Sequence, residues 1–410
     1  MGKQFVRWIV AIGLGISLVF GLMPGPAIAV TDEYQLVSEV WRLVNRTYLD
    51  ETFNHQNWWF VRQHGLNQPL PDRAAAYDAI RQMLASLNDP YTRFLPPEQY
   101  RSLQTSTSGE LTGVGLQIAK DEQDGTLAII APVEGSPAAA AGLQPRDRIL
   151  AIDGVSTVDL SLDEAANRMR GTLGTTVNLT FKRQQAAPEA LDLVRDRINL
   201  NPVSSRLSHI QSGFDVGYIR LSQFNGNATA GVAAAIAEFE AQGVAGYILD
   251  LRNNPGGLLT AGIEIARQWI DEGTIVYTVD RQGVLDSFEA KGSALTDAPL
   301  VVLVNEGTAS SSEILAGALQ DNHRAQLVGT RTFGKGLIQS LFDLSDGSGL
   351  VVTVAKYETP AHHDINRSGI RPDQRVSSSP TTREEVATED DQPYQVAVDL
   401  LAAAIAPSHG

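Results

Sequence analysis

Residues 299–320 read Pro-Leu-Val-Val-Leu-Val-Asn-Glu-Gly-Thr-Ala-Ser-Ser-Ser-Glu-Ile-Leu-Ala-Gly-Ala-Leu-Gln. The apolar run 300–304 predicts a short buried strand, and 306–308 is a turn. A helix is predicted over 311–320, because apolar residues recur there at the spacing of one helical face: Ile314, Leu315, Ala318 and Leu319. A strand that leads directly into a helix is the repeating unit of α/β folds.

The same alternation extends over residues 186–410 and predicts an α/β core. Strands are expected at 214–221, 246–251, 274–279, 300–304, 325–328 and 350–357. Helices are expected at 229–241, 260–271, 311–320 and 394–406.

Residues 106–185 have a different pattern, with short strands between turns and one helix at 161–170. The segment 135–154 resembles a nearly complete PDZ signature, so a mainly-β PDZ domain inserted before the core is expected. The loop at 113–118, ahead of this segment, resembles the carboxylate-binding loop of such domains. Its backbone N–H groups would capture a terminal carboxylate while the peptide adds a strand to the sheet. The substrate-binding residues are then Gly113, Val114, Gly115 and Leu116.

Residues 30–105 are predicted to be mainly helical. Apolar residues follow one stripe over 34–44, 73–84 has a similar pattern, and 89–98 is rich in turn residues. Trp58 and Trp59 are interpreted as packing residues.

Residues 1–29 have the pattern of a secretory signal peptide, with Lys3 and Arg7 ahead of an apolar run at 8–23. Ala-Ile-Ala at 27–29 fits the cleavage pattern, so export through the Sec route and a mature chain from about Val30 are expected. An uncleaved anchor is the alternative, although the run is short and two prolines follow it. No later apolar run can span a bilayer, so any membrane contact is expected to be peripheral.

Composition limits the partners. The formal net charge is −15, which argues against nucleic acid and anionic lipid. The chain has no cysteine, so an exported form would hold its fold without disulfides.

Two motifs offer a nucleophile and a base. Ser310 lies at the predicted strand-to-helix junction, and Lys335 lies in Phe-Gly-Lys-Gly at 333–336. A serine hydroxyl needs a base to remove its proton. Lysine has a reference pKa of about 10.4, but burial lowers it, and apolar neighbours and glycines surround Lys335. If Lys335 opens a strand, Gln339 stands on the same face and can orient the amine.

Each motif also has a structural interpretation. Ser-x-x-Glu is the pattern of a helix capping box, and a lysine between glycines is commonly a surface turn. Within the serine run, Ser311 and Ser312 are the alternatives to Ser310. A helix N-terminus also presents free N–H groups to an oxyanion, and Ser311 is the nearest donor. A second donor is expected from 250–257, although that segment could be only a tight loop.

The combined pattern Asn305-x-x-Thr-Ala-Ser-x-Ser-Glu-Ile with Phe-Gly-Lys-Gly resembles the carboxyl-terminal processing peptidases, serine proteases with a Ser–Lys dyad and an inserted PDZ domain. The resemblance implies an N-terminal helical bundle packed on the protease core. It also implies Ser310 as nucleophile, Lys335 as base, Gln339 as its partner and Gly256 as the second oxyanion donor. Ser311 replaces an alanine common in the family.

Segments 51–59, 355–365 and 369–373 resemble the photosynthetic branch of that family. This branch removes the C-terminal extension of the photosystem II reaction-centre precursor. The resemblance therefore implies that substrate, and a location in the thylakoid lumen or periplasm.

Other functions remain as alternatives: a general tail-specific periplasmic protease, or a PDZ scaffold without enzymatic activity. A Ser–His–Asp hydrolase is disfavoured because no Gly-x-Ser-x-Gly elbow is present. His362-His363-Asp364 lacks an accompanying His-Glu-x-x-His motif, so neither a metal nor a cofactor is expected.

Overall fold

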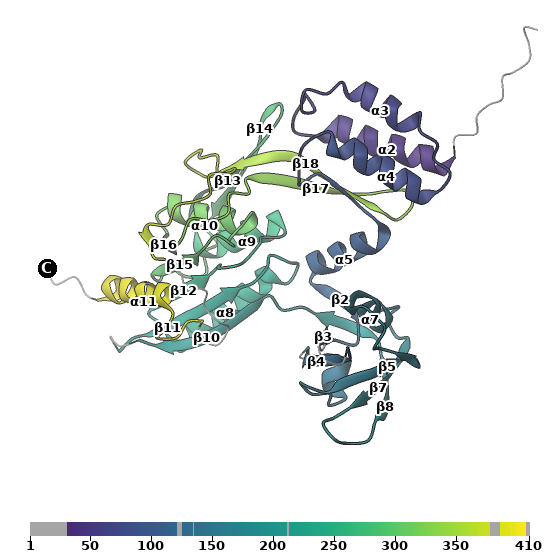
Figure 1. Cartoon of the computed structure of the whole chain (residues 1–410). Helices are drawn as coiled ribbons and strands as arrows, with labels where there is room; N and C mark the ends of the chain where they lie inside the picture. Colours follow the sequence, from purple (N-terminus) through teal and green to yellow (C-terminus); the bar gives the residue numbers. More distant parts are fainter. Residues whose placement is uncertain (1–30, 121–124, 134, 211–212, 378–385, 407–410) are drawn as a thin grey trace, which may run out of the picture.

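The computed structural model describes residues 31–120, 125–133, 135–210, 213–377 and 386–406 (Figure 1). The predicted signal peptide lies outside the described residues. Helix α5 (Pro97–Ser108) leads from the N-terminal helices toward the PDZ-like sheet, and the larger α/β part follows.

The core of the α/β part is a six-stranded sheet in the order β10-β11-β12-β15-β16-β19. Its first two strands form an antiparallel pair and the others are parallel. The strands are β10 (Val203–His209), β11 (Asp215–Leu221), β12 (Gly246–Asp250), β15 (Leu300–Val304), β16 (Ala325–Gly329) and β19 (Gln374–Arg375).

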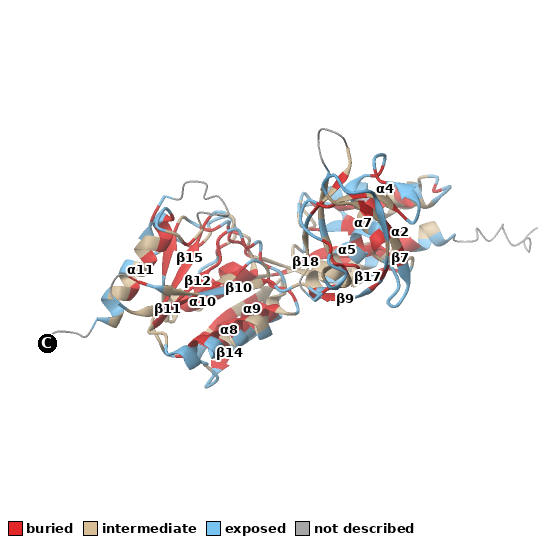
Figure 2. Cartoon of the chain, turned by 90° about the horizontal axis from the view of Figure 1, so that it is seen from below, coloured by how far each residue is buried: buried red, intermediate tan, exposed pale blue. Residues whose placement is uncertain are grey.

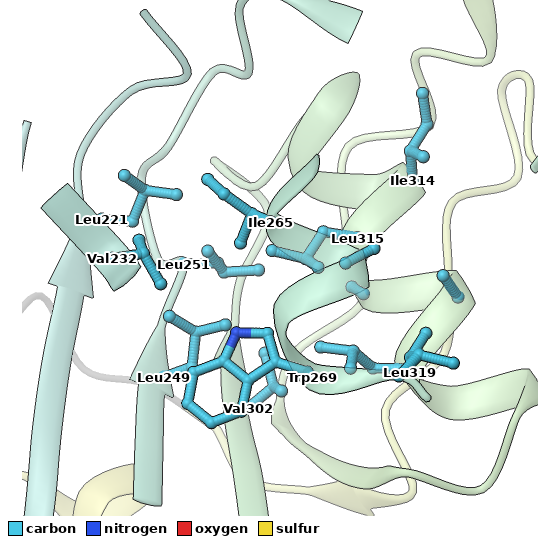
Figure 3. Packing of buried hydrophobic residues seen from close by; sticks show 14 of the residues in the cluster. Leu221, Val232, Leu249, Leu251, Ile265, Trp269, Val302, Ile314, Leu315 and Leu319 are labelled. Atoms are coloured by element: carbon cyan, nitrogen blue, oxygen red, sulfur yellow. The ribbon is translucent and has the colours of Figure 1, made fainter. Parts of the chain in front are cut away.

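Helices cover both faces of this sheet. One face packs against α8 (Ala228–Gln242), α9 (Leu259–Trp269) and α10 (Ser311–Asp321), and the other against α11 (Gln392–Ile405). Side chains alternate along β15: Val302 points to the first core, shown around Trp269 in Figure 3, and Val301 to the second. Strands buried on both faces are apolar throughout, which is why the apolar run at 300–304 correctly predicted a buried strand.

A second, antiparallel sheet joins the core to the N-terminal helices. It contains β1 (Arg93–Leu95), β13 (Glu272–Asp280), β14 (Gly283–Lys291), β17 (Leu337–Asp343) and β18 (Gly349–Glu358). Helices α2 (Asp32–Thr47), α3 (Trp58–Leu66) and α4 (Arg73–Ala85) pack on one end of it, where Leu350 and Val352 are fully buried. The other end of β18 contributes Tyr357 to the main core.

The PDZ-like sheet has the order β3-β4-β5-β7-β8, with β6 paired to β5. Its elements are β3 (Leu116–Lys120), β4 (Leu127–Pro132), α6 (Pro137–Ala140), β5 (Arg148–Ile152), β6 (Val155–Ser156), α7 (Leu162–Met169), β7 (Thr176–Lys182) and β8 (Glu189–Val194). The chain enters and leaves through the paired strands β2 (Glu110–Gly113) and β9 (Asp196–Asn199). The predicted boundary at 185 falls between β7 and β8, but these strands pair, so the sheet extends to Val194.

Most of the elements predicted for the core are observed within a few residues of their expected ends. The packing role is confirmed for buried Trp58 and is wrong for Trp59, which is 55% exposed. Helices α3 and α5 received no bounds of their own within the region predicted to be mainly helical, and the core strands β10 and β14 were not predicted. Figure 2 shows buried residues on the strands of the core and on the helices that pack against them, including most of α10. No helix in the described part of the chain is long and apolar enough to cross a membrane.

Candidate active site

Three loops meet at one edge of the core sheet. They follow β12, β15 and β16, which run parallel, so their carboxyl ends lie together at the edge where α/β folds place their ligands. Ala309 N–H donates to Asn254 O (3.0 Å), which joins the first two loops. Phe333 N–H donates to Thr308 O (3.0 Å), which joins the second and third.

Ser310 is the N-cap residue of α10 and has an unusual backbone conformation. Its φ is 58° and its ψ is −121°, a region that favours glycine. Its side chain is half-buried. Strained residues of this kind concentrate at functional sites, where the surrounding structure holds them in place.

The neighbouring serines have a different role. Ser311 and Ser312 are buried, and their hydroxyls donate to Gly257 O and Asn254 O, at 3.0 Å each. Both hydroxyls therefore tie α10 to the loop after β12. This distinguishes Ser310 from the two alternatives that the sequence left open.

Glu313 connects the serine and lysine segments. Its carboxylate is fully buried, and Oε2 accepts the N–H groups of both Ser310 and Lys335, each at 2.9 Å. Oε1 accepts the N–H of Gly334 (2.7 Å) and the hydroxyl of Thr332. Hydrogen bonds to an ionised acceptor are stronger than neutral ones. Glu313 thus caps α10, as the sequence pattern indicated, and also holds Lys335 beside Ser310.

Tyr357 forms a second link between the same two residues. Its side chain is 1% exposed, and its hydroxyl lies 3.1 Å from Ser310 O and 2.8 Å from Lys335 O. Burial raises the pKa of Tyr357 well above its usual value, so the hydroxyl remains a donor. The hydroxyl has one proton, which the two carbonyl oxygens share, so Tyr357 adds a second tie between the segments that Glu313 joins.

The environment of Lys335 favours the neutral amine. Burial lowers its pKa from the usual lysine value, and the nearby Arg93 lowers it further, whereas Glu313 and Asp89 act in the opposite direction. Lys335 Nζ lies 5.0 Å from the centre of the Tyr91 ring. A base with a lowered pKa is what proton removal from a serine requires.

Gln339 lies on a strand that begins after Lys335. β17 begins at Leu337, after Lys335, and its register against β18 shifts between Ile338 and Gln339. The premise that Lys335 opens this strand is therefore wrong, and the irregular pairing also interrupts the alternation, so strand geometry does not place Gln339 beside Lys335. Gln339 Nε2 is nevertheless buried, and it has no hydrogen-bond partner among the described residues.

Gly256 also differs from expectation, since its N–H donates to Asn254 Oδ1 (2.9 Å) and is not free. Glycine is required here for close packing, because a Cβ at this position would stand 2.8 Å from Ser310 Cβ. Its φ of 93° also favours glycine.

The N–H groups of Ser311 and Gly257 are better placed than that of Gly256 to donate to an oxyanion. Neither has a hydrogen-bond partner in the described parts of the chain. Gly256 O and Leu258 N–H both bond to Phe224. Gly256 C=O and Gly257 N–H belong to one trans peptide, so this N–H points away from Phe224. It therefore lies on the side where Gly257 O accepts from the Ser311 hydroxyl.

The predicted peptide loop of the PDZ-like part is shaped by backbone contacts. Gly115 has a φ of 77° and its carbonyl accepts from Val133 N–H (2.8 Å). Val114 O accepts from Ala138 N–H (2.9 Å), and a Cβ on Gly115 would collide with Ser136. The next strand, β3, is at the edge of its sheet and contacts α7. An edge strand beside a helix can accept an added peptide strand.

His362, one of the histidine pair considered for a metal, has two side-chain neighbours. The His362 ring stacks on Tyr277, with centroids 4.3 Å apart, and its Nδ1 lies 3.2 Å from Glu358 Oε2. The described residues contain no group of three or more His, Asp and Glu side chains suited to a metal ion.

Sequence reasoning missed three residues of this site. Glu313 was visible as a cap, but its bonds to the Lys335 loop were not. Tyr91 and Tyr357 carried no motif, because their contacts with Lys335 depend on tertiary structure alone.

Comparisons with known proteins identify two families along the chain. Residues 215–376 match the model of peptidase family S41, and residues 129–183 match a PDZ domain model. A carboxyl-terminal-processing protease of Synechocystis is 57% identical, with 100% of this chain and 96% of the relative aligned. Carboxyl-terminal-processing peptidase 2, chloroplastic, of Arabidopsis thaliana is 46% identical over 86% of this chain and 71% of its own length.

Among solved structures, a photosystem II D1 C-terminal processing protease is similar, with a TM-score of 0.59 and 42% identity. The match covers 89% of this chain and 99% of that chain.

Proposed function

Because the chain belongs to the carboxyl-terminal-processing proteases of peptidase family S41, which act through a Ser–Lys dyad, we propose that Ser310 is its nucleophile and Lys335 its general base. One observation carries this assignment: a single buried carboxylate oxygen, Glu313 Oε2, binds the backbone N–H groups of both residues. Ser311 and Ser312 donate their hydroxyl protons to loop carbonyls, and among the described residues the Ser310 hydroxyl donates to none.

In the proposed reaction, Ser310 Oγ attacks the carbonyl carbon of the scissile peptide bond while the Lys335 amine takes the hydroxyl proton. The resulting ammonium gives that proton to the departing amine. Water then hydrolyses the acyl-enzyme, with the amine again as base. Gln339, whose Nε2 is buried on β17 and has no hydrogen-bond partner among the described residues, is retained as the group that orients the amine.

The tetrahedral intermediate needs donors for its oxyanion. Ser311 N–H, at the first turn of α10, supplies one of them, and the positive end of the helix dipole favours the negative charge. Gly257 N–H supplies the second, in place of Gly256, whose N–H is held by Asn254. Gly256 keeps the two loops close enough for both donors to face one carbonyl.

The substrate is proposed to be a protein with a free C-terminus, captured by the PDZ-like part at Gly113–Leu116. The similar solved structure is of a protease for photosystem II D1. We therefore assign removal of the C-terminal extension of that reaction-centre precursor to this chain. The thylakoid lumen or periplasm is the matching location, reached by Sec export, with at most peripheral contact with the membrane.

The test uses protein starting at Val30 and synthetic peptides. One peptide carries the C-terminal extension of the D1 precursor, and others carry unrelated apolar tails; products are identified by mass spectrometry. Cleavage of the D1 peptide at one bond, well ahead of the others, supports the proposal. Equal cleavage of all tails would indicate a general tail-specific protease, and binding without cleavage would indicate a scaffold.

A further inference from the structure

A turn from the N-terminal helical part reaches the proposed base. Residues 89–92 follow α4, and the half-buried ring of Tyr91 lies against Lys335, with Nζ 5.0 Å from the ring centre. The helical part therefore contributes a side chain to the environment of the reacting amine, in addition to packing on the sheet.

The turn is anchored so that Tyr91 has a defined place. Asp89 Oδ1 accepts from Tyr91 N–H (2.9 Å) and Oδ2 from Thr92 Oγ1 (2.6 Å). Thr92 is buried, and its hydroxyl oxygen accepts from Thr353 N–H of β18 (3.0 Å). The following residues, β1, pair with β18 beginning at Arg93 opposite Val351. Backbone pairing on one side and the carboxylate on the other fix the turn to the sheet that leads to the active site.

The ring has two opposed effects on Lys335. Its face attracts an ammonium group, which favours the charged form. Its bulk keeps water from the amine, which favours the neutral form. The charged groups around Lys335 are Arg93 and Asp89 from the same segment and Glu313 from α10. Burial is the largest influence on the amine, and it lowers the pKa. We therefore expect the excluding effect of the ring to dominate.

We propose that Tyr91 is a positioning residue for the active site, covering Lys335 and holding its amine in a water-poor place. The proposal rests on the function proposed above, since it assumes that Lys335 is the base. It assigns the N-terminal helical part a direct influence on the reaction.

The experiment measures kcat/KM against pH with a free-acid peptide that the unsubstituted protein cleaves. Tyr91→Ala removes the cover, so the pKa of Lys335 should rise. The acidic limb of the kcat/KM profile should then shift to higher pH by about one unit. Activity at neutral pH then falls about tenfold and returns as the pH is raised. Tyr91→Phe keeps the ring and should leave the limb in place. Tyr91→Leu keeps an apolar cover without an aromatic face, so its limb should not rise.

Tyr34→Ala is the matched control, because Tyr34 is also half-buried in the helical part, where its hydroxyl donates to Gln68 O (3.1 Å) and its side chain packs on the N-terminal hydrophobic cluster. It should not move the limb. A Tyr91→Ala limb that stays in place, or a loss of rate that is equal at every pH, would overturn the proposal. Ser310→Ala, assayed in parallel, distinguishes failure of the Tyr91 proposal from failure of the proposed function: if this variant remains active, the dyad assignment itself fails.

Discussion

Replacing Glu313 by glutamine tests the contact on which the site depends. The carboxylate accepts four hydrogen bonds with its two oxygens: from Ser310 N–H, Lys335 N–H, Gly334 N–H and the Thr332 hydroxyl. A glutamine amide has one oxygen and one NH₂ group. Whichever way it turns, the NH₂ group faces two donors, so at least two of these bonds are lost.

The expected cost follows from that count. A hydrogen bond to a charged group contributes about 1.5–3 kcal/mol, so two of them amount to about 3–6 kcal/mol. This is a large share of the 5–15 kcal/mol typical of whole domains. Because the bonds join two loops, the loss should appear first as local opening around Ser310 and Lys335. Amide exchange there should accelerate by about two to four orders of magnitude.

Hydrogen exchange read by mass spectrometry over 308–316 and 330–338 provides the assay, together with kcat/KM. Glu306→Gln is the control, since this carboxylate is exposed on the adjacent turn and accepts from the Thr330 side chain (2.8 Å), with no bond to the Lys335 segment among the described residues. It should change neither quantity appreciably. Unchanged exchange in both segments of Glu313→Gln, with full activity, would refute the idea that this carboxylate joins the dyad.

Three further outcomes are expected. Lys335→Arg should be as inactive as Lys335→Ala in peptide cleavage, because a guanidinium stays protonated and cannot accept a proton; substantial activity would mean that Lys335 supplies charge only. Amidating the substrate C-terminus should raise KM, and equal cleavage of acid and amide at low concentration would argue against capture by Gly113–Leu116. The lowered pKa of Lys335 keeps the amine neutral to lower pH, so kcat/KM should fall only below the usual lysine value of about 10.4. Bound substrate excludes more water, so the limb of kcat should lie lower still, and coincident limbs would contradict this reasoning.

The sequence was sufficient where one local pattern determined the structure. The apolar run at 300–304 and the helical spacing after it correspond to β15 and α10, because both elements are buried and neither needs a distant partner to be recognised. The serine and lysine motifs were found for a similar reason, since their residue types are unusual in combination.

Contacts between segments that are distant in the chain could not be predicted from the sequence. The alternation argument for Gln339 assumed that Lys335 opens a strand, but β17 begins at Leu337, and its register shift arises from its pairing with β18. Gly256 fitted the donor role by position, yet the side chain of Asn254 occupies its N–H. Tyr91 is brought to Lys335 by a turn anchored on another strand, which no spacing rule reveals.

The dyad itself is tested most directly by comparing Ser310→Ala, Lys335→Ala and Ser312→Ala with the unsubstituted protein on one free-acid tail peptide, with products followed by mass spectrometry. Nucleophile and base act as a unit, so each of the first two changes should abolish cleavage while the fold is retained. Ser312→Ala should still cleave the peptide, because its hydroxyl holds Asn254 O and takes no part in the chemistry. Cleavage by Ser310→Ala at the unsubstituted rate, or its loss in Ser312→Ala alone, would contradict the assignment of Ser310 as nucleophile.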